Sequence, residues 1–296
     1  MNRSILSEAE IEHFVEYGFV HVPKALDPEF CREQTELAFK RLGYDPRDAT
    51  SWTEAKIHMP NMNSWPVKEI APRAWAAMAD LAGGEERIAS PQQASWGDGF
   101  ILNLTFGADR PWSPPSADHE GWHKDGDFFY HFLDSPEQGL LCAVYWSDIA
   151  HQGGGTYVIA DSVPVVARFL NDNREGIHPN DPRWKELPSL CSDFREITAK
   201  TGDVFLLHPF MLHASSQNML GVPRFMTNPC LKLSQPMRFD RENPEEHSPI
   251  ERAVLRGLGV DRLDFHIAGE RRENVPERVR RQRDMLEQER ARLAGS

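Results

Sequence analysis

The amino-acid sequence predicts a mainly β fold with flanking helices, in which short strands build a jelly roll or a barrel. Apolar side chains alternate with a period of two in short runs between residues 96 and 235, which is the spacing of strands. Turns rich in Gly and Pro separate these runs. Helical patterns precede and follow them. We therefore expect a single domain over residues 1–296.

Residues 1–95 are expected to form a mainly helical support for the sheet. Ser7, followed three residues later by Glu10, is a capping box, and Gly residues follow the apolar stripes where helices commonly end. These signals predict helices over about residues 8–17, 28–42 and 73–82. Residues 44–70 are rich in Trp, Met, Pro and Asn, and they predict either a packed connection or the rim of a pocket.

The jelly-roll core is expected at residues 96–235. In its first run, Phe100 and Leu102 share one face, whereas Ile101 and Asn103 share the other. A polar side chain on an inner face indicates a cavity. Further strands are predicted at residues 139–148, 156–160, 195–199, 204–207, 212–216 and 224–233. An inserted helical and polar excursion is predicted at about residues 162–190.

Residues 236–296 are expected to be a helical extension. Ser248 and Asn274 each precede a Pro within the first turn of a helical pattern. The second of these helices is highly charged as far as Leu293 and has few apolar residues. It therefore either packs lightly on the surface or meets a partner.

The composition excludes several classes of protein. A net charge of -12 argues against a nucleic-acid partner, which requires a basic surface. No run approaches the roughly 18 apolar residues that span a membrane, and the N-terminus resembles no signal peptide, so we expect a cytoplasmic protein without a membrane partner. The four cysteines are far apart in sequence, which argues against a disulfide scaffold or a structural zinc knuckle. We expect a monomer or a homodimer.

Chemistry concentrates around His123-x-Asp125. On an extended strand, side chains two residues apart point to one face, so this imidazole and carboxylate are able to bind one metal ion. The pair alone is a weak signal. His213 lies far downstream, and Arg224 follows it by eleven residues across one turn. Two His and one carboxylate form a facial triad that leaves half of an octahedral iron open, and an Arg nearby suits a carboxylate ligand.

In this ordered set the chain resembles the phytanoyl-CoA dioxygenase family of Fe(II)/2-oxoglutarate oxygenases. The resemblance covers most of the chain. It begins at Leu6-Ser7, Phe14 and Tyr17-Gly18-Phe19-Val20-His21-Val22-Pro23, continues through His123-x-Asp125 and the Gly-rich turn before Thr156, and ends at Gly202-Asp203, His213-x-Ser215, Asn218 and Arg224. It departs from the family where Ile159-Ala160-Asp161-Ser162 replaces the usual Pro-Gly-Ser-His. It implies a double-stranded β-helix core of the jelly-roll, cupin-like kind.

The resemblance also implies the cofactors and their ligands. By position, His123, Asp125 and His213 would bind Fe(II), with O2 as the oxidant. Arg224 would pair with 2-oxoglutarate, the co-substrate. Further candidates for binding the co-substrate are Asn103, Thr156 and Ser215.

Asp125 separates two branches of the family. Halogenating relatives lack this carboxylate because chloride takes its place, so its presence implies oxygenation. The reaction implied is oxidation, most simply hydroxylation, of an unactivated C–H bond in a small, hydrophobic metabolite, with release of succinate and CO2.

Several neighbours are candidates for the substrate side of the site. Trp146 faces the cavity by strand parity and would wall the iron site. His119 shares the parity of His123, and Asp127 shares that of Asp125. Phe129 would suit an apolar substrate. For His119, simple exposure is the alternative, and for Phe129 a place in the core.

Two other classes of function remain open. A zinc hydrolase on a cupin-like barrel would also use His and Asp ligands. It leaves the spacing of His213 and Arg224 unexplained. A jelly roll that only binds a ligand would have no need of a complete triad together with Arg224.

Overall fold

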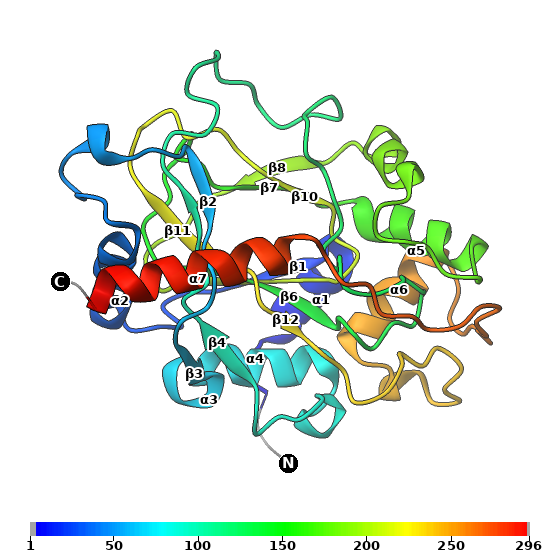
Figure 1. The fold of residues 1–296 in the computed structure, drawn as a ribbon. Helices are drawn as coiled ribbons and strands as arrows, with labels where there is room; N and C mark the ends of the chain where they lie inside the picture. The colour runs from blue at the N-terminus through cyan, green and yellow to red at the C-terminus, as the bar shows by residue number, and fades with distance from the viewer. Residues whose placement is uncertain (1–3, 295–296) are drawn as a thin grey trace.

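The computed structural model describes residues 4–294, and antiparallel strands form its centre (Figure 1). The larger sheet has the strand order β1-β9-β6-β11-β5-β2, and β12 also pairs with β6. Its strands are β1 (Phe19–Val22), β2 (Lys56–His58), β5 (Ile101–Asn103), β6 (Leu140–Tyr145), β9 (Val204–Leu207), β11 (Arg224–Thr227) and β12 (Cys230–Leu231).

A smaller sheet faces the larger one across a cavity. Its order is β10-β7-β8, with β7 at Thr156–Ile159, β8 at Phe194–Ile197 and β10 at His213–Ser215. Side chains of both sheets, such as Leu141 of β6 and Thr156 of β7, line the same cavity. The mainly β fold with a double-stranded β-helix core is therefore confirmed.

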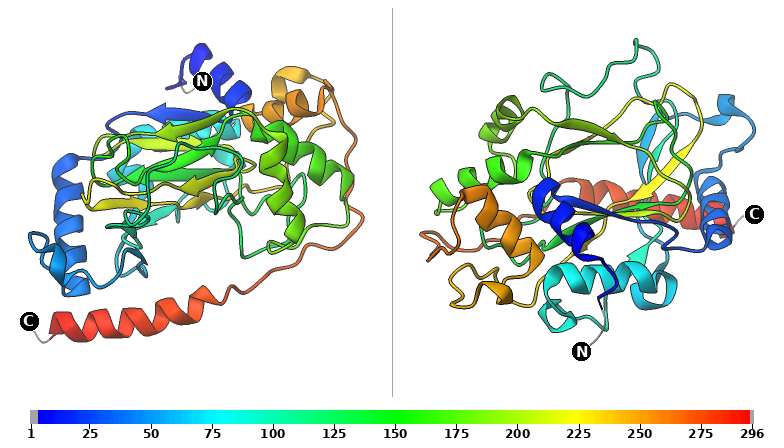
Figure 2. Two further views of the ribbon diagram at one scale, coloured as in Figure 1. Left: turned by 90° about the horizontal axis from the view of Figure 1, so that it is seen from above. Right: turned by 180° about the vertical axis from the view of Figure 1, so that it is seen from behind.

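Helices cover the outside of the larger sheet and its ends (Figure 2). Three of them begin where the capping signals predict, because Ser7 and Ser248 each form a complete capping box and Asp27 caps the second helix. The last helix begins at Arg278, later than Asn274 predicts, because the Asn274 side chain donates to the Asp127 carbonyl. The α-helices are α1 (Glu8–Tyr17), α2 (Pro28–Leu42), α3 (Val67–Ile70), α4 (Pro72–Ala82), α5 (Ser162–Asp172), α6 (Pro249–Leu258) and α7 (Arg278–Ala294). A short pair, β3 (Ser64–Pro66) with β4 (Ser95–Gly97), lies beside α4.

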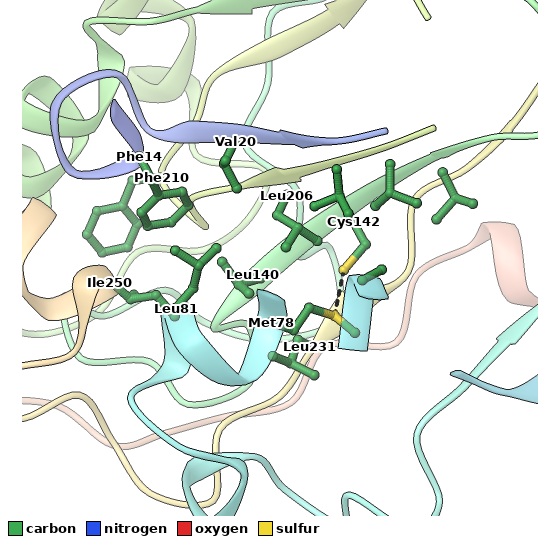
Figure 3. Close-up of a cluster of buried hydrophobic side chains, with 14 of the residues drawn as sticks. Phe14, Val20, Met78, Leu81, Leu140, Cys142, Leu206, Phe210, Leu231 and Ile250 are labelled. Carbon is green, nitrogen blue, oxygen red and sulfur yellow. Dashed lines mark hydrogen bonds between the residues drawn. The ribbon is translucent and has the colours of Figure 1, made fainter. Parts of the chain in front are cut away.

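The main hydrophobic core lies between the larger sheet and α1, α4 and α6, not between the two sheets (Figure 3). Leu140 and Cys142 of β6 face this core, where the Cys142 thiol contacts the sulfur of Met78 at 3.4 Å. The alternate residues Leu141 and Ala143 face the cavity. The sheet thus has a helix-covered face and a cavity face.

Trp146 lies on the helix-covered face, so the prediction that it walls the iron site is wrong. Its ring packs against Phe30 of α2 and against Phe100, with ring centroids 5.8 and 5.3 Å away. Its indole nitrogen donates to the Thr227 hydroxyl at 3.1 Å. The parity along β6 explains this position, because even-numbered residues from Leu140 onward point to the helices.

Segments outside residues 96–235 complete the walls of the cavity. β1 and β2 add strands to the larger sheet at its two edges. At the other end of the chain, α7 crosses in front of both sheets in Figure 1. Among the described residues, no helix has both the length and the hydropathy that crossing a membrane requires.

Candidate metal centre

His123, Asp125 and His213 meet at one end of the cavity between the sheets. His123 lies opposite His213 of β10, and the two residues exchange a pair of backbone hydrogen bonds, both 3.0 Å long. This bridge places the two imidazole rings 4.3 Å apart between centroids. Gly126 follows Asp125 in a left-handed conformation with φ +114°, where a β-carbon would clash with Phe129 and His131.

The donor atoms of the three side chains converge. Asp125 Oδ1 lies 3.2 Å from His123 Nε2 and 3.5 Å from His213 Nε2. One donor atom from each residue lies within 4.8 Å of the other two. Two imidazole nitrogens and one carboxylate oxygen at this separation are able to bind one divalent transition metal on a single face.

Backbone carbonyls hold both imidazoles in the orientation that a metal needs. His123 Nδ1 lies 2.8 Å from the Gly121 carbonyl oxygen, and His213 Nδ1 lies 3.2 Å from that of Met211. When Nδ1 carries the proton and donates it to a carbonyl, the lone pair of Nε2 is left for a metal. Both Nε2 atoms face Asp125.

Asn228 orients the carboxylate in the same way. Its Nδ2 donates to Asp125 Oδ2 at 2.7 Å, so that Oδ1 faces the imidazoles. Burial alone would raise the pKa of Asp125, but His213 and His123 hold it well below its ordinary value. The carboxylate is therefore ionised.

Arg224 is a buried cation in the larger sheet. Arg224 is 1% exposed. It is the first residue of β11, which lies between β5 and β6 in the sheet. Its Nε donates to the Gly154 carbonyl at 2.7 Å and its Nη1 to the Ile101 carbonyl at 3.1 Å, whereas Nη2 has no partner among residues 4–294. Burial lowers the pKa of Arg224 to about 10, so the guanidinium stays charged at neutral pH. No carboxylate of the described chain forms an ion pair with it.

A second cation, Lys56 of β2, lies in the same part of the cavity. Its Nζ donates to the Ser215 hydroxyl at 2.6 Å. Burial, together with the charge of Arg224, lowers the pKa of Lys56 to about 8. Thr156 also lines this region, and its hydroxyl accepts a hydrogen bond from Tyr145 at 3.0 Å. Lys56 therefore places a positive charge in the cavity, and the buried Arg224 lies close enough to lower the pKa of Lys56.

Asn103 lies directly opposite Arg224 in the sheet, but both polar atoms of its side-chain amide are already hydrogen-bonded to backbone groups. Its Nδ2 donates to the Ser216 carbonyl, and its Oδ1 accepts from the Phe106 amide, each at 3.1 Å. Asn103 also packs closely on Gly154, where a β-carbon would lie 2.7 Å from Nδ2. It positions the strand ends around Arg224 and does not line the cavity.

The predicted substrate-side residues separate into those that line the cavity and those that do not. Asp127 lines it and forms a bidentate ion pair with Arg278 of α7, at 2.6 and 2.8 Å. Phe129 is buried against His131, and its neighbour Phe128 lines the cavity in its place. His119 packs on Tyr157 and bonds the Ser215 carbonyl at 3.2 Å.

Several residues of this cavity are not singled out by the sequence, among them Lys56, Asn228, Arg278 and Gln282, whereas His58 lies in the segment for which a pocket rim was one of the two expectations. Lys56 and His58 lie on the three-residue edge strand β2, which is too short for its periodicity to be recognised. Asn228 contacts Asp125 across 103 positions of sequence. The density of Trp, Met and His near His58, which suggested a pocket rim, was the one available signal.

The cavity has a volume of about 630 Å³, which suits a co-substrate and a small molecule together. The described donors fit the implied cofactors. The two Nε2 atoms and Asp125 Oδ1 form the nitrogen and oxygen set that ferrous iron accepts. Nη2 of Arg224 has no hydrogen-bond partner among the described residues, and no described carboxylate pairs with this guanidinium. It is therefore a buried, charged donor that is able to bind one carboxylate of a dicarboxylate ligand.

Comparison with known proteins places most of the chain in one family. The family model described as "Phytanoyl-CoA dioxygenase (PhyH)" matches residues 14–226. No curated protein sequence matches the chain.

Several solved structures match the chain at low sequence identity. The non-heme alpha ketoglutarate dependent carbocyclase SnoK from nogalamycin biosynthesis is 13% identical, with 91% of this chain and 97% of that chain covered and a TM-score of 0.49. AviO1 from Streptomyces viridochromogenes Tue57 is 15% identical, with 79% and 97% covered and a TM-score of 0.47. HygX from Streptomyces hygroscopicus, with nickel and 2-oxoglutarate bound, is 13% identical, with 75% and 85% covered and a TM-score of 0.43.

Proposed function

Because the chain belongs to the phytanoyl-CoA dioxygenase family and is an Fe(II)/2-oxoglutarate-dependent dioxygenase, we propose that it hydroxylates an unactivated C–H bond of a small molecule. Fe(II), 2-oxoglutarate and O2 are its cofactor and co-substrates. One observation supports the proposal most strongly. Three converging metal donors line one cavity, and the charge of a buried arginine, which has no acidic partner among residues 4–294, acts on two other lining residues, Lys56 and His58.

We assign the iron to His123 Nε2, Asp125 Oδ1 and His213 Nε2. The Gly121 and Met211 carbonyls hold the imidazoles in the required tautomer, and Asn228 holds the carboxylate. When bound there, iron would supply the activation of O2, the oxidant, whose one oxygen atom is used in the oxidative decarboxylation of 2-oxoglutarate to succinate and CO2 and whose other is used on the substrate. The residues of the chain fix geometry and exclude water.

We assign the distal carboxylate of 2-oxoglutarate to Arg224, with Lys56 as a second cation. Ser215 and Thr156 are neutral donors near that carboxylate. Bringing a dicarboxylate into this cavity would satisfy the free Nη2 of Arg224 and offset the positive charge beside it. Asn103 acts indirectly, because its amide holds the strand ends that flank Arg224.

The inner wall of the cavity suits the part of the substrate that is oxidised. Leu141 and Ala143 of β6, Leu207 of β9 and Met226 of β11 give it an apolar surface. A hydrocarbon segment of the substrate would lie against these side chains without leaving a polar group unsatisfied. Of the expectation that the substrate is hydrophobic, we therefore keep only that its oxidised part is a hydrocarbon segment.

Equilibrium dialysis under nitrogen tests the proposal directly. We expect the wild type to retain one Fe(II) and, in its presence, one 2-oxoglutarate. Asp125→Ala should lose the metal, and Arg224→Ala should keep the metal but lose the co-substrate. A zinc hydrolase on the same scaffold would bind metal with no requirement for 2-oxoglutarate, and that result would reject the proposal.

A further inference from the structure

The C-terminal helix α7 forms one wall of the cavity, although it lies beyond residues 14–226, where the family model matches. Arg278 and Gln282, one turn apart on α7, both line the cavity. Figure 1 shows α7 in front of the two sheets, and the view from behind in Figure 2 shows it on the far side of them. This wall therefore belongs to the chain's own extension.

Contacts at both ends of α7 fix its position. The segment before it runs along the loop after Asp125, where the Asn274 amide donates to the Phe128 carbonyl and the Tyr130 amide donates to the Arg272 carbonyl, at 2.8 and 2.9 Å. Near its other end, Glu289 pairs with the fully buried Arg41 at 2.7 Å. The helix is therefore held across the cavity, so its inward side chains have fixed positions.

The side chains that α7 and the surrounding loops present to the cavity are polar but carry no net charge. Arg278 is neutralised by both oxygens of Asp127. Burial, with the charges of Lys56, Arg224 and Arg278, lowers the pKa of His58 to about 4, so this imidazole is neutral. The remaining polar side chains here are the amides Asn61, Asn180 and Gln282.

These amides have hydrogen-bonding capacity that the described chain does not use. Asn61 Oδ1 accepts from the Gly99 amide at 2.7 Å, and its Nδ2 has no hydrogen-bond partner in the described part of the chain. Gln282 Oε1 receives one long bond of 3.4 Å from Arg278, and its Nε2 has no partner within residues 4–294. The side-chain amide of Asn180 and the His58 ring form no hydrogen bond to any described residue. Donors and acceptors thus face the cavity in comparable numbers.

Two lysines, Lys56 and Lys124, also line the cavity, but neither adds an unpaired charge to the wall formed by α7. Lys56 lies beside Ser215, at the end that we assign to 2-oxoglutarate. Lys124 Nζ lies within 3.2 Å of three acceptors, namely the Asp125 carbonyl, His131 Nδ1 and Gln138 Oε1. Neither lysine is left to recognise a charged group of the substrate.

We propose that the substrate is an uncharged, polyhydroxylated small molecule, and that Gln282 and Arg278 of α7 determine specificity by binding its hydroxyl groups together with His58 and Asn61. Hydroxyl groups both donate and accept, which matches free amides, a neutral imidazole and a neutralised ion pair. A charged substrate would require an unpaired opposite charge on this wall. A wholly apolar substrate would leave these polar groups without partners. The proposal rests on the proposed function, because the substrate compartment is the space left beside the iron and 2-oxoglutarate.

Binding of three probes with one six-membered carbon ring tests this inference. The probes are myo-inositol, cyclohexanol and cyclohexanecarboxylate, measured by saturation-transfer NMR on protein loaded with Zn(II) and 2-oxoglutarate. We expect myo-inositol to bind best. Gln282→Leu and Arg278→Ala should each weaken it by about fivefold, which corresponds to about 1 kcal/mol. Arg281→Ala is the matched control, because that side chain is 77% exposed on the same helix, and it should change nothing.

Every other outcome overturns the inference. Preference for the carboxylate would show a charged substrate, and preference for cyclohexanol an apolar one. Absence of binding by all three probes, or equal binding by Arg278→Ala and wild type, would remove α7 from substrate recognition. The amounts of Zn(II) and 2-oxoglutarate bound are measured in the same samples, so a failure of the metal centre is detected separately.

Discussion

At the scale of single residues, Asn228 illustrates how a side chain orients a proposed metal ligand, Asp125, without being a ligand itself. It holds Asp125 Oδ2 at 2.7 Å, and this contact turns Oδ1 toward His123 and His213. Asn228→Ala should weaken Fe(II) binding by roughly 10- to 100-fold, the usual cost of removing such a support. Calorimetric titration under nitrogen measures this effect. Asn180→Ala, which alters another cavity amide, should leave Fe(II) affinity unchanged, and equal losses in the two variants would contradict the role of Asn228.

Arg224 provides the corresponding test for the co-substrate. Arg224→Leu removes a buried charge that has one unused donor, so 2-oxoglutarate affinity should fall by about 10- to 100-fold, or about 1.5–3 kcal/mol for a charged hydrogen bond. Fe(II) affinity should stay the same. Arg183→Ala, which disrupts a surface pair with Asp181, is the control and should alter neither constant. Unchanged 2-oxoglutarate binding in Arg224→Leu would reject its assignment.

Lys56 predicts a dependence of co-substrate affinity on pH. Its pKa is lowered to about 8, first by burial and then by the charge of Arg224. The ammonium is therefore present below about pH 8 and lost above it, so 2-oxoglutarate affinity should be highest on the acid side and fall as pH rises through this value. Titrations between about pH 7 and about pH 9 measure this, and Lys56→Met should flatten the profile. The same slope in Lys56→Met would exclude Lys56 as its source.

The sequence predicted the residues whose spacing along the chain is regular, and it missed those whose contacts depend on tertiary structure. His123, Asp125, His213 and Arg224 stand in an order that carries information, and the structure brings the first three together in the cavity and buries Arg224 in the larger sheet. Asn228 has no such pattern, since an asparagine after a strand is common in turns. Its partner Asp125 lies 103 positions away in the sequence, and only the folded structure brings the two side chains together.

At the scale of elements, the alternation of residues along a strand shows which side chains share a face, but it does not show which face lines the cavity. The alternation in β6 was visible in the sequence, but both of its faces are apolar, because one covers the core and the other lines the cavity. The choice of face for Trp146 therefore could not be made from residue type. The helices were easier, because capping residues mark their ends independently of tertiary contacts.

The position of α7 depends on a buried ion pair that the sequence did not reveal. Arg41 lies between Asp98 and Glu289, at 2.9 and 2.7 Å, and all three side chains are nearly inaccessible to solvent. Glu289→Ala should lower the free energy of unfolding by about 1–3 kcal/mol and should speed amide exchange in α7. Hydrogen exchange with mass spectrometry measures the helix directly. Glu287→Ala, on the exposed face of α7, is the control, and matching exchange rates in the two variants would contradict an anchoring role.

At the scale of the whole molecule, the cavity joins segments from nearly the full chain, from β2 to α7. Ligands that bind only the folded protein stabilise it, by about 2.7 kcal/mol at a concentration 100 times the Kd. Fe(II) and 2-oxoglutarate together should therefore raise the Tm by several degrees, about 2 °C per kcal/mol for a chain of this size. In calorimetry under nitrogen, Arg224→Leu should show only the part of the Tm rise that Fe(II) causes, and Asp125→Ala should show no rise in Tm. A full shift in both variants would mean that the ligands bind elsewhere.

Succinate release tests the central claim most directly. Wild-type protein is supplied with Fe(II), ascorbate, O2 and 2-oxoglutarate, and succinate is quantified with time. We predict steady succinate formation by the wild type, even without the organic substrate, and background levels for Asp125→Ala. Arg224→Leu should need a much higher concentration of 2-oxoglutarate. No succinate from a wild type that retains iron and 2-oxoglutarate, or equal rates in wild type and Asp125→Ala, would contradict the proposed centre.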